Sequence, residues 1–298
     1  PKAQAGLSKT SRLSRLRYYG YIILALVTAL GAVVTNNLII LLVCWGLSGA
    51  LLYLLIGYGR NERTASTAQK AFIIIGGTDA FMMLGVILIA QLSGSYDMQH
   101  ISRNPISLDQ PQAVYAFVCL FVGVLAKAGA MPLHTWLVDT AEDAPIPVTA
   151  FLPASVDKLL GIYLLARMVL DLFVISPAMS TVLLLIGSLT IVGAGLMMLV
   201  QQDAKRVLGY CAVSQVGYIL LGIGSGHPLG IAGGLFHMLN HAIYKSCLFF
   251  STGAVEQQAR TTDIERLGGL AKHMPVVFGC FFIAALSVSG VPPLNGFA

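Results

Sequence analysis

Charged side chains lie inside stretches of this sequence that are otherwise apolar. Lys127 lies in the apolar stretch 123–130, Lys158 follows Asp157 in a second stretch, and Asp79 lies deep in a third. A lysine at the centre of a lipid bilayer costs about 3 kcal/mol on insertion scales, so such residues often mark ion pathways. Because burial disfavours the charged form, a buried lysine can gain and lose a proton near neutral pH. These residues are therefore candidates for carrying protons.

Three further ionisable residues share one face of an expected helix. His237, His241 and Lys245 follow one another at intervals of four residues, which stacks their side chains on the same side of an α-helix. Such a stripe within an apolar helix is typical of a proton relay. Zinc binding by the two histidines is the alternative, but the glutamate of an HExxH motif does not accompany them.

Simpler roles are open to the other candidates. Lys127 could extend its ammonium group toward the membrane surface, and Lys158 could form a structural ion pair with a neighbouring helix. Asp157 and Lys158 could also pair with each other, although adjacent residues on a helix point about 100° apart. Asp79 could pair with Lys127, carry protons itself, or form a polar plug with Thr78.

The composition identifies the environment of these residues. Of the 298 residues, 56% are hydrophobic and only 10% are charged, against roughly 25% in a soluble domain. This excludes a soluble enzyme, a nucleic-acid-binding domain and a disordered regulator. Recurring apolar runs of about 20 residues instead predict an all-α polytopic membrane protein. Because the sequence has no CxxC pair, phosphate loop or nucleotide fingerprint, we expect no catalytic residue, cofactor or metal in this chain.

Apolar length predicts about nine membrane spans, at 18–35, 37–58, 70–91, 112–131, 147–175, 178–200, 206–223, 230–253 and 275–290. Their alternation places one set of basic residues on a single side, which the positive-inside rule makes cytoplasmic, and only Arg103 on the other. The set is Lys2, Lys9, Arg12, Arg15, Arg17, Arg60, Arg63, Lys70, Lys205, Arg206, Arg260, Arg266 and Lys272. The loop 132–146 belongs on the basic side but holds only acidic charges, so we expect the fourth span to break and partly re-enter.

The spacing of the spans predicts inverted repeats of five transmembrane helices. Spans one and six start 160 residues apart (178 − 18), and spans four and nine start 163 residues apart (275 − 112). Both matched spans break at proline, at Pro132 and at Pro292 and Pro293, a layout typical of secondary transporters. Because the chain starts at Pro1 and stops inside an apolar segment, we expect it to be part of a longer one. The expected parts are a basic segment at 1–17, a first half at 18–175 and a second half at 176–298, truncated at its broken helix.

Motifs occur in order along nearly the whole chain, at 125–139, 144–150, 157–163 followed by Arg167, 205–210, 214–218, 237–245 and 290–297. Together they resemble the antiporter-like, proton-translocating membrane subunits of respiratory complex I. The same family includes the Mrp sodium/proton antiporters, formate hydrogenlyase and the membrane-bound energy-converting hydrogenases.

The resemblance implies a role for each candidate residue. Lys127 would be the central protonatable lysine of an input half-channel, and Lys158 would connect the two half-channels. His237, His241 and Lys245 would continue the hydrated axis. The chain would be a non-catalytic pumping subunit of the inner membrane, with its basic N-terminal segment in the cytoplasm. Its partners would be lipid, other membrane subunits, some of them paralogous, and a peripheral redox arm with iron–sulfur clusters and a flavin or nickel–iron site.

One position departs from the family's pattern. A glutamate commonly follows the tryptophan of the family's fifth helix, whereas Gly46 follows Trp45 here. Either Asp79 takes over the role of partner to Lys127, or the first half-channel works differently or not at all. The favoured function is a proton-translocating subunit of a redox-driven complex. The alternatives are a cation/proton antiporter subunit of Mrp type and the membrane subunit of an inorganic-carbon uptake complex.

Overall fold

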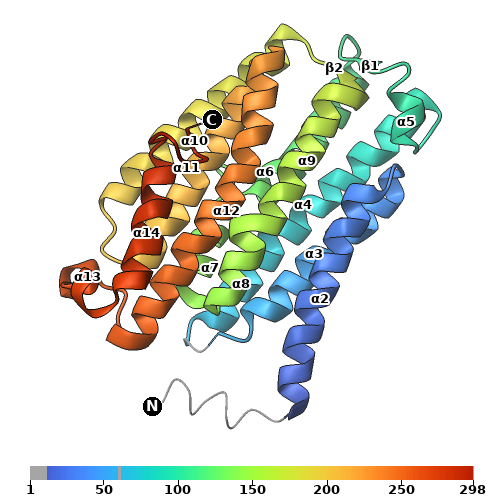
Figure 1. The fold of residues 1–298 in the computed structure, drawn as a ribbon. Coiled ribbons are helices and arrows are strands. Elements are labelled where there is room, and N and C mark those ends of the chain that lie inside the picture. Colours follow the sequence, from blue (N-terminus) through green and yellow to red (C-terminus); the bar gives the residue numbers. More distant parts are fainter. Residues whose placement is uncertain (1–11, 60–61, 298) are drawn as a thin grey trace.

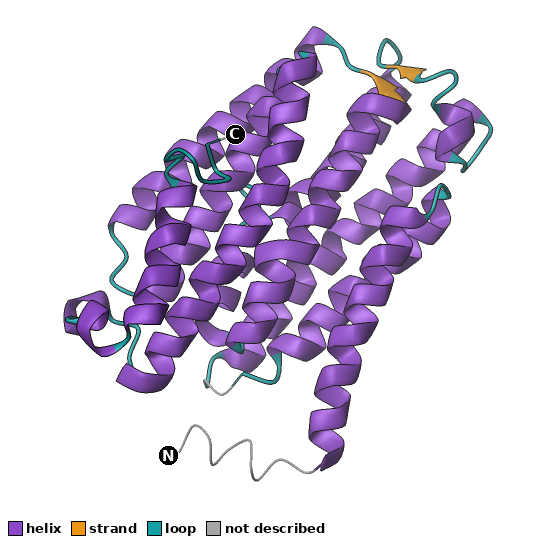
Figure 2. Cartoon of the chain, in the orientation of Figure 1, coloured by secondary structure: helices purple, strands orange, loops and turns teal. Residues whose placement is uncertain are grey.

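The computed structural model describes residues 12–59 and 62–297, which form a bundle of long helices (Figures 1 and 2). Of the basic residues considered above, Lys2, Lys9 and Arg60 lie outside the described residues. The long helices are α2 (Arg12–Val34), α3 (Leu38–Ile56), α4 (Thr64–Ser93), α6 (Pro111–Ala128), α9 (Asp157–Arg167), α10 (Pro177–Leu199), α11 (Ala204–Gly224), α12 (Pro228–Ala259) and α14 (Pro275–Val288). The shorter elements are α5 (Met98–Ile101), α7 (Thr135–Asp143), α8 (Ile146–Phe151), α13 (Leu270–His273), the π-helical turns η1 (Leu152–Val156) and η2 (Met168–Leu172), the 3₁₀ turn η3 (Ile264–Arg266), and the parallel strands β1 (Ile106–Ser107) and β2 (Phe173–Val174).

Seven helical segments of the described chain are long and apolar enough to cross a membrane. They correspond to the first seven expected spans, and the fifth is assembled from α8, η1, α9 and η2. The eighth expected span is α12, which has 32 residues but carries the polar stripe, and the ninth is α14, which has 14 residues. The prediction of an all-α, multi-pass membrane fold is therefore confirmed.

Turns at opposite ends of the bundle repeat one another. Asn37 caps α3 and forms an isolated antiparallel bridge with Asp97, while Asp203 caps α11 and forms the same kind of bridge with Asp263. Corresponding residues of the two bridges are 166 positions apart (203 − 37 and 263 − 97). In Figure 1, α5, which follows the first bridge, and α13, which follows the second, lie at opposite ends of the bundle. The two halves are therefore related by an inverted repeat, as the span spacing predicted.

The fourth expected span is a broken helix, as predicted. α6 ends at Ala128, Gly129 adopts the left-handed conformation with a φ of 75°, and α7 starts at Thr135. Glycine suits this position because a left-handed φ strains residues that have a Cβ atom. Pro132 lies in the gap between the helices, where its missing N–H interrupts no helical hydrogen bond.

The acidic residues after this break meet the basic side of the bundle. Asp139 pairs with Lys70 of α4 at 2.6 Å, and Glu142 pairs with Arg206 of α11 at 2.7 Å. α7 therefore continues to the face that carries the basic residues and does not turn back at the break. This explains the excess of acids in 132–146, since their partners are the basic ends of neighbouring helices.

The second break follows α14. This helix ends at Val288, Gly290 adopts a left-handed φ of 71°, and Pro292 and Pro293 lie in the irregular segment beyond it. The Asn240 side chain of α12 donates a hydrogen bond to the Asn295 carbonyl at 2.7 Å, which fastens this segment to the bundle. Both broken helices thus lie where the prolines predicted them.

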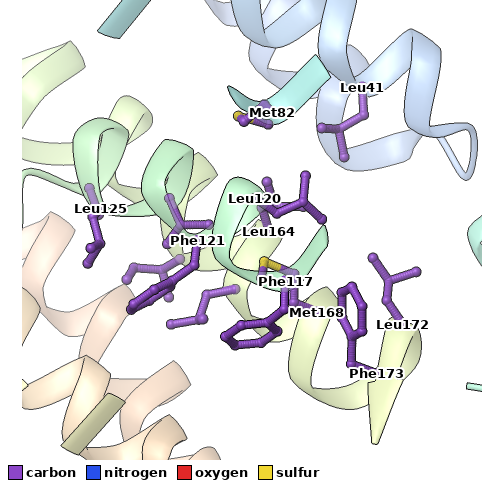
Figure 3. Packing of buried hydrophobic residues seen from close by; sticks show 14 of the residues in the cluster. Leu41, Met82, Phe117, Leu120, Phe121, Leu125, Leu164, Met168, Leu172 and Phe173 are labelled. Atoms are coloured by element: carbon purple, nitrogen blue, oxygen red, sulfur yellow. The ribbon is translucent and has the colours of Figure 1, made fainter. Parts of the chain in front are cut away.

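An apolar core joins α6 to the surrounding helices. Phe117 and Phe121 of α6 lie near Leu164 and Met168 at the end of the fifth span, with Met82 of α4 on another side (Figure 3). The backbones of α6 and α9 approach closely, because a Cβ atom on Gly161 would lie 2.8 Å from the backbone nitrogen of Ala128. This core fixes the relative positions of the two helices that carry Lys127 and Asp157.

Candidate functional site

Lys127 lies in the last turn of α6, and its side chain has no exposed surface. Its Nζ atom lies 3.1 Å from Oδ1 of Asp157 on α9 and forms an ion pair with it. From α3, the Trp45 carbonyl accepts a hydrogen bond at 3.3 Å, and the Ser48 hydroxyl accepts another. Nζ also lies 5.3 Å from the centre of the Trp45 indole ring, in the range of a cation–π contact. These contacts hold Lys127 inside the bundle rather than extended toward the membrane surface.

Asp157 is the first residue of α9, directly after the π-helical turn η1. Pro153 lies in that turn and lacks the N–H that a regular helix uses, which accounts for the wider turn. The Asp157 side chain has no exposed surface, and no residue that the structure describes donates a hydrogen bond to it. Since an unbalanced buried charge is costly, the Lys127 ammonium is what compensates this carboxylate.

Lys158, the next residue, faces the second half of the bundle. Its Nζ atom donates a hydrogen bond to the Ala212 carbonyl of α11 at 2.7 Å and lies 3.2 Å from Nε2 of His241 on α12. Lys158 therefore does not pair with Asp157, one of the possibilities considered from the sequence. The physical reason is the rotation of about 100° between consecutive helical residues, which points the two side chains at different helices.

The histidine stripe of α12 forms a short polar chain. His241 is buried and His237 is half-buried, with ring centres 6.4 Å apart. The His237 Nε2 atom lies 2.7 Å from Oε1 of Gln215 on α11, and the Tyr244 hydroxyl donates to the same oxygen at 3.1 Å. Among the described residues the two histidines therefore face Gln215 and Lys158, not a third ligand for zinc.

Lys245 is the last residue of the stripe, and it has different contacts from the two histidines. Its side chain is fully buried, and its Nζ atom donates a hydrogen bond to the Leu208 carbonyl of α11 at 3.3 Å. His237 and Lys245 thus contact α11, and of the three only His241 contacts a predicted site residue on another helix, Lys158 of α9.

Asp79 lies on α4, beside Gly46 of α3. Its Oδ2 atom lies 3.7 Å from the point where a Cβ atom on Gly46 would be, so the carboxylate fills space beside that glycine. The Thr78 hydroxyl donates to the Ile75 carbonyl at 2.7 Å, so it does not cap Asp79. Asp79 is half-buried, less enclosed than Lys127 and Asp157.

The inverted repeat relates Asp79 to Lys245. These residues lie on α4 and α12 and are 166 positions apart (245 − 79), the interval that also relates the left-handed caps of the two helices, Gly94 and Arg260. Each half therefore carries one charged residue at the same place in its repeat unit, with opposite sign. The sequence did not reveal this relation, because the two halves share a layout rather than residue identities.

Three further polar residues join the site without having been singled out as site residues from the sequence. Ser48 and Gln215 are buried inside expected spans, and Tyr244 lies within the histidine stripe. A polar side chain inside an apolar helix is a usable signal, since buried polar groups need partners. Gln215 and Ser48 could have been found on that ground. Tyr244 could not, because its large apolar ring suits the interior of a packed helix whether or not its hydroxyl takes part in a site.

Comparisons with known proteins place this arrangement in a broader group. Residues 35–298 match the family model described as NADH:quinone oxidoreductase/Mrp antiporter, TM. The Na⁺/H⁺ antiporter subunit A1 of Staphylococcus aureus is 36% identical over 307 residues, which cover 98% of this chain and 38% of that protein. The chain therefore spans less than two fifths of the length of these curated relatives.

Two solved structures share the fold. The Mrp complex from Dietzia sp. DQ12-45-1b contains a chain that superposes with a TM-score of 0.87 at 25% identity, covering 93% of this chain and 52% of that one. The membrane-bound sulfane sulfur reductase, an archaeal respiratory membrane complex, contains one with a TM-score of 0.82 at 29% identity, covering 92% of this chain and 56% of that one.

Proposed function

The chain belongs to the NADH:quinone oxidoreductase/Mrp antiporter family of membrane subunits, and we propose that it carries protons across the membrane as part of a larger ion-translocating complex. The observation that carries this proposal is the fully buried Lys127–Asp157 pair, followed directly along α9 by Lys158, a second buried lysine that contacts His241. Ionisable groups inside membrane helices are costly and are the working parts of proton relays.

The proposed path crosses the bundle from the first half to the second. Its side chains are not in continuous contact, but several have buried polar atoms with no hydrogen-bond partner among the described residues. Such atoms are normally satisfied by water, which can also pass a proton between neighbouring groups. The proposed order is Asp79 and Lys127, then Asp157 and Lys158, then His241 and His237, with Lys245 beside the second half.

A polar hollow on the basic face supports the proposal that the proton path reaches solvent there. It encloses about 210 Å³ and is lined by charged residues that include Arg63, Lys70, Asp139 and Arg206. It lies at the end of α7, the second part of the broken helix. The first part of that helix, α6, carries Lys127. By the positive-inside rule we propose that this face is cytoplasmic, in a bacterial inner membrane.

The driving energy must come from partner subunits or from an ion gradient. Moving one charge against 100 mV takes about 2.3 kcal/mol, and no redox cofactor is implied by the residues of the described site. The likeness to a sodium/proton antiporter subunit over nearly the whole chain favours exchange of a cation for protons. The likeness to a respiratory membrane complex supports redox drive as the second candidate, with iron–sulfur, flavin or nickel–iron centres in a peripheral arm.

The test uses everted membrane vesicles that carry the full-length protein with its partner subunits, with a dye that reports internal pH. Sodium added without an electron donor is expected to release protons from the vesicles under antiport. An electron donor without sodium is expected to acidify them under redox drive. Vesicles with an equal amount of assembled Lys127→Ala protein serve as the control and should lose the response. No response to either addition in the unaltered protein contradicts the proposed function.

A further inference from the structure

We infer that Asp157 is the counter-ion that controls the charge of Lys127, and that it does so from the helical turn that also carries Lys158. The inference rests on the proposed function, because it concerns how the proton-carrying residues are tuned. It makes Asp157 a positioning residue that acts through Lys127.

The groups that face Lys127 come from three helices. α3 supplies only the neutral carbonyl of Trp45 and the hydroxyl of Ser48. α4 supplies Asp79, whose carboxylate lies beside Gly46 and forms no ion pair with Lys127 in the described part of the chain. α9 supplies Asp157, the only carboxylate of the described residues that pairs with Lys127, at 3.1 Å. The ion pair therefore connects α6 to α9, not to α3.

The packing fixes this pair in place. Gly161 lies one helical turn after Asp157, and Ala128 follows Lys127 directly. Because a Cβ atom on Gly161 would lie only 2.8 Å from the Ala128 nitrogen, the two backbones are nearly in contact beside the ion pair. Neither side chain has exposed surface, so bulk solvent screens the attraction between them less than it would at the protein surface.

Of the two neighbouring buried lysines, Lys127 and Lys158, only Lys127 has a carboxylate partner among the described residues. Lys158 turns away from Asp157 to the Ala212 carbonyl and His241, and neither contact carries a negative charge that could balance an ammonium group. Among the described residues, Asp157 therefore offsets the positive charge of Lys127, and no carboxylate pairs with Lys158. When a proton leaves Lys127 and another arrives at Lys158, the net charge of the three groups stays the same.

The decisive variant is Asp157→Asn, assayed in vesicles containing the full-length protein and its partner subunits. This variant removes the carboxylate that lies 3.1 Å from the buried Lys127 ammonium group, so we expect the profile of proton flux against pH to move to lower pH. At neutral pH we expect the flux to fall at least about tenfold, which requires the loss of only about 1.4 kcal/mol of electrostatic stabilisation. A lower flux with an unmoved pH profile would indicate a structural role and overturn the inference.

A second-site variant tests whether charge is what matters. A Cβ atom on Gly49 of α3 would lie 3.9 Å from Nζ of Lys127 and 3.3 Å from Cγ2 of Ile75, so an aspartate there supplies a carboxylate from the opposite helix once the Ile75 side chain moves slightly. We expect Asp157→Asn with Gly49→Asp to recover flux and pH profile toward the unaltered protein. The matched control, Asp157→Asn with Gly49→Asn, has the same size without the charge and should not recover. Equal recovery by both would contradict a counter-ion role.

The outcomes separate this inference from the proposed function. No proton flux in the unaltered protein removes the proposed function, whereas normal flux that Asp157→Asn leaves unchanged removes only the inference. If Asp157→Asn fails to assemble, Asp157→Glu gives the answer, because its longer side chain keeps the charge but changes its distance from Lys127. Asp157→Glu should then shift the pH profile while Asp109→Glu, on an exposed loop, should not. Identical profiles for the two would overturn the inference.

Discussion

A buried lysine and a buried aspartate neutralise one another inside this bundle, 3.1 Å apart and without exposed surface. Bringing both charges out of water is expensive, and good geometry repays only part of that cost. Such a pair is therefore weak evidence for stability and stronger evidence for function. It also explains why Lys127 can lie within an apolar helix, since Asp157, Trp45 and Ser48 replace the hydration of its ammonium group.

Removing one member of the pair should destabilise the protein more than removing both. Lys127→Met leaves the Asp157 carboxylate uncompensated, and we expect a loss of about 3–5 kcal/mol. Lys127→Met with Asp157→Leu replaces the pair by apolar groups and should recover most of that stability. Thermal unfolding of the purified complex in detergent measures both effects. Equal stability of the single and double variants would show that the pair does not compensate the buried charges.

Helix packing sets the geometry that these side chains need. The broken helix α6–α7 brings Lys127 to α9, and the π-helical turn η1 precedes Asp157. Gly161 allows the two helices to approach, and the aromatic core of α6 holds them together (Figure 3). A change in this packing should affect transport even where no ionisable residue is altered.

Gly161→Ala tests that dependence. The added methyl group meets the Ala128 backbone, so we expect about 1–3 kcal/mol of destabilisation from overpacking and a reduced proton flux. Gly195→Ala on α10 is the matched control, because a Cβ atom there meets nothing within 4 Å. That control should be neutral or slightly stabilising, since alanine favours helix over glycine. Thermal unfolding and vesicle flux of the two variants are compared. A loss of similar size in both would exclude the close helix contact as the cause.

The whole bundle consists of two inverted halves, which meet where α7 packs against α11 and where α8 and η1 pack against α12. Each half has a broken helix and one charged residue at equivalent positions, Asp79 in the first and Lys245 in the second. The ends of α4, α7 and α11 meet in ion pairs on the basic face. We propose that the proton path begins at one membrane face of this bundle and ends at the other.

The orientation of these faces can be measured with introduced cysteines in a variant whose native cysteines are replaced by alanine. Asp109→Cys lies in an exposed loop of the face opposite the basic residues, and Gly268→Cys lies in an exposed loop of the basic face. We expect a membrane-impermeant thiol reagent added to intact cells to label only the first. Labelling of Gly268→Cys alone would reverse the proposed orientation. Permeabilised cells, in which both positions react, provide the control for accessibility.

The sequence by itself determined the all-α membrane fold, the first seven of the nine expected spans, the two helix breaks and the inverted relation of the halves. These properties depend on apolar length, on proline and on the spacing of charges, all of which are local along the chain. It also identified Lys127, Asp157, Lys158 and the histidine stripe as a set. Their roles in transport and the boundaries of the halves remain predictions.

Only the tertiary structure decided which of these residues meet. From the sequence, Asp79 was the candidate partner of Lys127, and Asp157 could have paired with Lys158. In the structure, α9 packs on α6 so that Asp157 forms an ion pair with Lys127. Lys158 instead contacts His241. The pairing depends on the rotation of α9 after a π-helical turn and on a close backbone contact at Gly161. These two contacts join residues that are 30 and 83 positions apart in the sequence. Local sequence patterns do not predict the angle at which two helices pack, and that angle decides which side chains meet.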